Sequence, residues 1–128
     1  MIQKISEKPL FLVYVYAFLL LIATTIPTSD LLRIQRVNRI FSLILSDKSL
    51  HFIGFGLLAW LLCYGYRQAH KRFFYIRSGV VSVGYGLLIE LIQIFLPYRM
   101  FSFGDLAADA AGVVVALGLF YAFTTRRP

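Results

Sequence analysis

Two acidic residues and a histidine interrupt the apolar stretches of this 128-residue chain. Glu90 lies within one apolar stretch, Asp109 stands about one turn inside another, and His51 lies near the start of a third. An acidic residue inside a membrane-spanning helix costs on the order of 2.5–3.5 kcal/mol on insertion scales, so it is rare without a partner or a function. Because carboxyl and imidazole groups can donate and accept protons, these three residues are candidate catalytic residues.

Helical spacing places further polar and small residues on the same faces. Glu90 and Gln93 share one face with Gly86, while Asp105 and Asp109 share another with small residues. Small residues let helices approach closely, which would bring Glu90 toward Asp109. We therefore expect a polar pocket at one end of the helices, with eight candidate binding residues: Asp47, Lys48, His51, Glu90, Gln93, Arg99, Asp105 and Asp109.

Other interpretations of these polar residues stay open. They could simply satisfy one another as structural contacts between helices, for example Arg99 with Asp105. A metal bound by His51, Glu90 and Asp109 is conceivable, but these residues are scattered singly, without H-x-x-x-H or C-x-x-C spacing. We therefore predict neither a metal site nor a cofactor.

The composition indicates that these residues lie in a membrane. The chain is 59% hydrophobic with a mean hydropathy of +0.76, whereas soluble domains are roughly 45–50% apolar. Charged residues make up only 15% and cluster between long apolar runs. The formal charge of +7 is distributed over these short segments, which argues against nucleic acid as a partner and for membrane lipids.

The apolar runs predict an all-α fold, an integral membrane four-helix bundle that forms a single domain over residues 1–128. Residues 31–45 form an amphipathic segment between the first two helices, expected on the membrane surface, although it could instead cover the bundle or act as a soluble connector. The first run is long for a signal peptide and no A-x-A site follows it. The four crossings are predicted at residues 10–26, 50–66, 79–96 and 106–123.

Charge distribution predicts the orientation of the bundle. With four crossings, both termini and the 67–78 link share one side, which holds the larger share of the 13 Lys and Arg residues. The positive-inside rule then places both termini in the cytoplasm. The candidate polar pocket would accordingly face outward.

Two stretches resemble the VanZ-like family of bacterial membrane proteins. Residues 47–52, Asp-Lys-Ser-Leu-His-Phe, resemble that family's D-K-x-x-H-F segment, which opens a membrane helix. Residues 90–93, 97–99 and 105–112 resemble its E-x-x-Q, P-x-R and D-x-x-x-N-x-x-G segments. Asp109 stands where the family commonly has Asn, and Ala116 where a second glycine is common. The resemblance implies a multi-pass cell-envelope protein of the bacterial cytoplasmic membrane.

Together these observations lead to three hypotheses. The first is an outward-facing pocket that binds a lipid headgroup, a cell-wall precursor or a glycopeptide-type antibiotic, the last by resemblance to the teicoplanin-resistance protein that names the family. The second is an intramembrane acid–base enzyme acting on a lipid-linked substrate, with Glu90 or Asp109 as the acid–base and His51 as its partner. The third is a non-catalytic membrane scaffold. The sequence leaves both catalysis and oligomeric state open.

Overall fold

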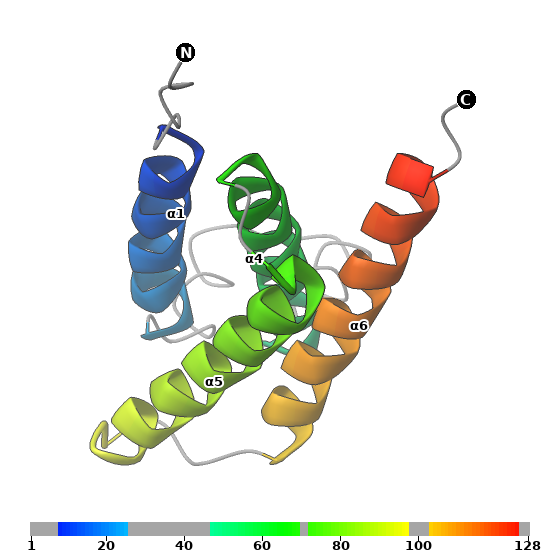
Figure 1. Cartoon of the computed structure of the whole chain (residues 1–128). Coiled ribbons are helices and arrows are strands. Elements are labelled where there is room, and N and C mark those ends of the chain that lie inside the picture. The colour runs from blue at the N-terminus through cyan, green and yellow to red at the C-terminus, as the bar shows by residue number, and fades with distance from the viewer. Residues whose placement is uncertain (1–7, 26–46, 70–71, 98–102, 126–128) are drawn as a thin grey trace, which may run out of the picture.

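The computed structural model describes residues 8–25, 47–69, 72–97 and 103–125 of the chain. These residues form four helices and, within the described ranges, no strand (Figure 1). The helices are α1 (Lys8–Thr25), α4 (Asp47–Gln68), α5 (Phe74–Ile94) and α6 (Phe103–Thr125). The prediction of an all-α membrane bundle of four helices is confirmed. The predicted amphipathic segment at residues 31–45 lies outside the described residues.

The surface of the bundle suits a lipid environment. Three helices, Lys48–Gln68 in α4 together with α5 and α6, are long and apolar enough to cross a membrane, while the apolar part of α1 is shorter. Large apolar side chains point outward along the helices, among them Phe11, Val80 and Val114. Polar side chains such as His51 and Glu90 are buried instead. The bundle is therefore apolar outside and locally polar inside, as expected for a membrane protein.

Helix α5 begins at Phe74 rather than at the predicted Gly79, and it ends at Ile94 rather than at residue 96. The residues before Gly79 belong to the 67–78 link expected between two crossings, yet they begin the helix, and Tyr75 among them packs against α6. The Tyr75 hydroxyl lies 3.5 Å from Thr124 Oγ1, and the Tyr75 ring contacts Phe120 edge-on. Phe73 caps the helix with a positive φ of 57°, a backbone conformation that is unusual for a bulky residue. Tertiary packing has therefore extended this helix toward its N-terminus.

Helix α4 is the centre of the bundle and packs most extensively against α6. Backbones touch directly where the two helices cross. A Cβ atom added to Gly112 would collide with the carbonyl oxygen of Phe52, and one added to Gly56 would lie 3.0 Å from the carbonyl oxygen of Gly112. Glycine at these positions therefore sets the distance between α4 and α6, as small residues commonly do at membrane helix crossings.

Helix α1 is attached to the bundle through hydrogen bonds from tyrosine hydroxyls. Tyr16 donates to the carbonyl oxygen of Gly54 at 2.7 Å, and Tyr85 on α5 donates to the carbonyl oxygen of Ala17 at 2.6 Å. Such bonds connect α1 to both α4 and α5. The first turn of α1 and the last turn of α6 lie at the same end of the bundle (Figure 1).

Substituting either tyrosine tests this attachment. Tyr16→Phe and Tyr85→Phe are each expected to lower the free energy of unfolding by about 1 kcal/mol, because each removes one hydrogen bond and keeps the ring. Tyr14→Phe is the matched control, since Tyr14 lies on the same helix and is 69% exposed. Thermal unfolding in detergent micelles measures all three, and an equal loss in Tyr14→Phe would contradict the assignment.

Candidate functional site

Polar side chains gather at the end of the bundle opposite the first turn of α1. The last turns of α1 and α5 and the first turns of α4 and α6 lie at this end (Figure 1). Five of the eight predicted binding residues lie together at this end, each no more than 7% exposed. They are His51 from α4, Glu90 and Gln93 from α5, and Asp105 and Asp109 from α6.

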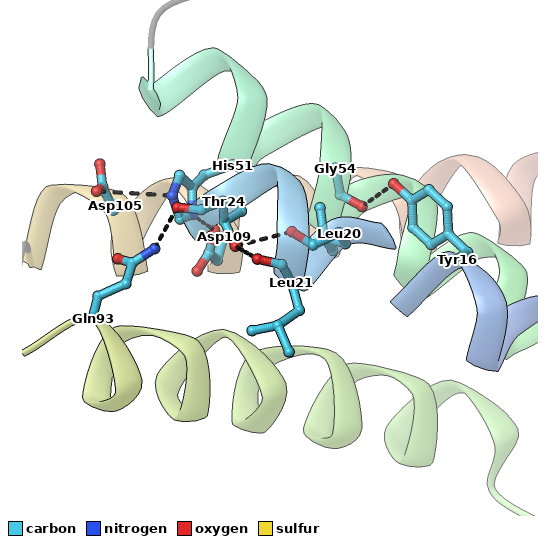
Figure 2. A network of polar contacts seen from close by, with 9 residues as sticks. All are labelled: Tyr16, Leu20, Leu21, Thr24, His51, Gly54, Gln93, Asp105 and Asp109. Carbon is cyan, nitrogen blue, oxygen red and sulfur yellow. Dashed lines mark hydrogen bonds and ion pairs between the residues drawn. The ribbon is translucent and has the colours of Figure 1, made fainter. Parts of the chain in front are cut away.

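His51 is the residue that joins these helices. Its Nδ1 lies 2.7 Å from Asp109 Oδ1. A carboxylate can only accept a hydrogen bond, so Nδ1–H of His51 donates to Asp109. Its other ring nitrogen, Nε2, lies 3.8 Å from Asp105 Oδ2, which is an ion-pair distance and too long for a hydrogen bond (Figure 2). The ring also stacks on Phe55, with the two planes 7° apart, so its orientation is fixed from three directions.

A glycine on α5 makes room for the second oxygen of Asp109. A Cβ atom added to Gly86 would lie 2.6 Å from Asp109 Oδ2 and 3.3 Å from the Phe55 ring. The predicted approach of α5 to α6 through small residues therefore takes place at Gly86, with the Asp109 carboxylate against the α5 backbone.

Glu90 follows Gly86 by one helical turn and is fully buried. One carboxylate oxygen of Glu90, one of Asp105 and one ring nitrogen of His51 all lie within 4.8 Å of one another. Helices α4, α5 and α6 thus each place one side chain that can exchange a proton or bind a metal ion in the same small volume. The sequence predicts that these polar helix faces come together.

Gln93 connects this cluster to α1. Its Nε2 donates to the carbonyl oxygen of Thr24 at 2.8 Å, and the Thr24 hydroxyl donates back to Leu20 and Leu21 (Figure 2). Sequence reasoning missed Thr24, although the adjacent threonines at the end of the first apolar run were a usable signal. Thr24 lies in the last turn of α1, where backbone carbonyls have no donor within the helix, so its carbonyl oxygen is available to Gln93.

Of the three remaining predicted residues, the structure describes the side chain of Lys48 alone. Lys48 is exposed and lines a shallow groove between α4 and α6. Ser49, Phe52, Ile53 and Ala108 form the rest of that groove. The side chain of Asp47 and the whole of Arg99 lie outside the described residues. The described members of the eight predicted binding residues thus fall into two groups: a buried cluster of five, and Lys48, which is exposed in a mostly apolar groove.

This arrangement can perform two kinds of chemistry. A carboxylate that fixes one imidazole nitrogen leaves the other nitrogen oriented for proton transfer or for coordination of a cation. The groove, in contrast, offers an apolar surface with an ammonium group at Lys48, which suits an amphiphile with an anionic head.

Comparison with known proteins supports the resemblance seen in the sequence motifs. The family model described as VanZ/LLP1 matches residues 10–124. An uncharacterized protein of the fission yeast Schizosaccharomyces pombe, C11E3.10, is 32% identical over 83 residues, which is 65% of this chain and 51% of that protein. The chain thus spans about half the length of this relative. No solved structure matches.

Proposed function

Because the chain belongs to the VanZ/LLP1 family, we propose that it is a cell-envelope protein that binds the head group of an anionic membrane lipid in the groove between α4 and α6. The observation that carries this proposal is the position of Lys48. It is the charged residue among those that line a mostly apolar groove on the outside of the bundle. The chain is proposed to lie in the bacterial cytoplasmic membrane with both termini in the cytoplasm, so that the groove faces outward.

The groove has the two surfaces that an amphiphile requires. Phe52, Ile53 and Ala108 provide apolar contacts for an acyl chain, and Lys48 provides a positive charge for a phosphate. The buried cluster and the groove use neighbouring residues of the same two helices, since His51 precedes Phe52 on α4 and Asp109 follows Ala108 on α6. The His51–Asp109 hydrogen bond therefore holds together the two helices that form the groove walls.

Among the ligand classes expected from the sequence, a lipid head group fits best. The similarity to a fission yeast protein favours a ligand that bacterial and fungal membranes share. A cell-wall precursor carried on an anionic lipid would use the same phosphate contact. A role in tolerance of teicoplanin would then be indirect, through the lipid-bound precursor, rather than through direct binding of the antibiotic.

Lipid retention by purified protein tests this proposal. Lys48→Ala is expected to weaken binding of an anionic phospholipid about fivefold, because one lysine near an anionic surface contributes about 1 kcal/mol. Binding of phosphatidylcholine should not change. Arg67→Ala is the matched control, since Arg67 is an exposed cation at the opposite end of α4. Native mass spectrometry measures the retained lipid, and equal losses in both variants would show that the groove has no special role.

The His51–Asp109 hydrogen bond favours a second candidate function, an acid–base enzyme acting on a lipid-linked substrate. In this mechanism Asp109 orients the imidazole and Nε2 of His51 exchanges the proton. Turnover of a lipid-linked substrate by wild-type protein, lost in a folded His51→Gln variant, would support it. If Nε2 is instead bound to a cation, it cannot act as the base.

A further inference from the structure

The buried cluster contains a set of side chains with the chemistry and spacing of a metal site. His51, Glu90 and Asp105 are each no more than 7% exposed, and one ligand atom from each lies within 4.8 Å of the others. They come from α4, α5 and α6, so the fold brings them together from distant parts of the chain. We propose that these three residues bind one divalent transition-metal ion, of the class of Zn²⁺ or Mn²⁺.

The orientation of His51 supports this assignment. Metal-bound histidines commonly donate their second ring N–H to a carboxylate, which fixes the tautomer and the direction of the ring. Asp109 is that carboxylate, 2.7 Å from Nδ1. The lone pair of Nε2 is thereby left on the side of Asp105. The Nε2–Oδ2 separation of 3.8 Å is too long for a hydrogen bond, but two ligands bonded to one ion at roughly 2.0–2.2 Å lie about 3–4 Å apart.

Gln93 provides an independent indication. Its Oε1 atom is buried and has no hydrogen-bond partner among the residues that the structure describes. Donation from Nε2 to Thr24 fixes which way the carboxamide faces, so the oxygen is the atom left for another partner. Gln93 stands one turn beyond Glu90 on α5, and Figure 2 shows its carboxamide on the side of α5 where Asp105 and His51 lie. This oxygen can complete the coordination or accept from a metal-bound water.

The donor set selects the class of metal. One imidazole nitrogen with two carboxylate oxygens suits first-row transition metals, whereas Mg²⁺ and Ca²⁺ favour sites built from oxygen alone. The expectation of no metal site relied on local spacing. Local spacing carries no signal here because each ligand is on a different helix. The structure also changes the role of Asp109, from an alternative ligand to the partner of Nδ1.

This inference does not depend on lipid binding in the groove, since none of its ligands is a groove residue. It does bear on the enzyme hypothesis. A metal ion on Nε2 of His51 would remove the only ring nitrogen free to act as a base, because Nδ1 is bonded to Asp109. A metal ion bound by His51 would therefore support a cation-binding role for the cluster and argue against His51 as the general base.

Equilibrium metal binding to the full chain in detergent provides the test. Protein is stripped with a chelator, desalted and titrated separately with Zn²⁺, Mn²⁺ and Mg²⁺, and bound metal is measured by mass spectrometry. Wild-type protein is expected to hold about one Zn²⁺ or Mn²⁺ per chain, with Mg²⁺ at least tenfold weaker. His51→Ala and Asp105→Asn should each lower affinity more than tenfold, and Asp109→Asn by roughly 10–100-fold. The control Arg67→Ala, at the opposite end of α4, should bind as wild type.

Thermal unfolding with and without metal shows whether each variant is folded, so that a loss of metal binding is not mistaken for a loss of structure. Metal should raise the midpoint of wild-type protein and of Arg67→Ala, and should leave that of folded Asp105→Asn unchanged. The proposal is overturned if wild-type protein binds none of these ions stoichiometrically. It is equally overturned if folded His51→Ala and Asp105→Asn bind as tightly as Arg67→Ala.

Discussion

Gly112→Ala is expected to destabilise the bundle by about 3 kcal/mol. An added Cβ would collide with the carbonyl oxygen of Phe52, which is backbone and cannot rotate away. Overpacking typically costs 1–3 kcal/mol, and the upper part of that range applies when two helices must separate. Since α4 and α6 share the most extensive interface of the bundle, the loss would affect the whole fold. Reversible unfolding in mixed micelles measures the change.

Gly118→Ala is the matched control on the same helix. Nothing lies within 4 Å of a Cβ added at Gly118. Alanine is about 1 kcal/mol better than glycine inside a helix, so this variant should be neutral or slightly stabilised. Comparable destabilisation by the two substitutions would mean that the close crossing at Gly112 does not determine stability.

Asp109→Leu is expected to cost about 3–5 kcal/mol. The substitution leaves the buried His51 without the carboxylate that accepts from Nδ1, and breaking a buried pair by removing one partner is strongly destabilising. Asp109→Asn should cost less, about 1–2 kcal/mol, because its amide oxygen can still accept this hydrogen bond.

A double-mutant cycle with His51→Leu shows whether the effect comes from this pair. The double variant His51→Leu/Asp109→Leu removes both polar groups and should be less damaged than the sum of the two single variants, with a coupling of about 2 kcal/mol or more. Additive losses would show that the two residues do not interact in the membrane-embedded protein.

The helical patterns predicted much of the fold and of the buried cluster. Spacing on each helix gave the faces that carry Glu90, Gln93, Asp105 and Asp109, and four alternating helices brought those faces to one end. The sequence could not give the pairing within the cluster. That pairing depends on ring orientation and on the space at Gly86, which places the Asp109 carboxylate beside His51 and the α5 backbone.

Other features could not be predicted because they arise from tertiary contacts. Phe74 and Tyr75 fall in the 67–78 link expected from the sequence, yet α5 includes both, and Tyr75 packs on Phe120 and Thr124. Lys48 and His51 share a motif and, three residues apart, the same side of α4. Lys48 nevertheless lies in the first turn of the helix and is exposed at the groove, whereas His51, one turn further in, is buried. A motif read along the chain does not separate these two environments.

Photolabelling with a photoreactive anionic phospholipid tests most directly whether this end of the bundle binds an amphiphile. Labelling of wild-type protein in nanodiscs should concentrate on residues 48–53 of α4 and on Ala108 of α6. It should fall several-fold in Lys48→Ala and stay unchanged in Arg67→Ala. The proposed function would be contradicted if labelling were spread evenly over the exposed apolar faces of α4, α5 and α6 and did not change in Lys48→Ala.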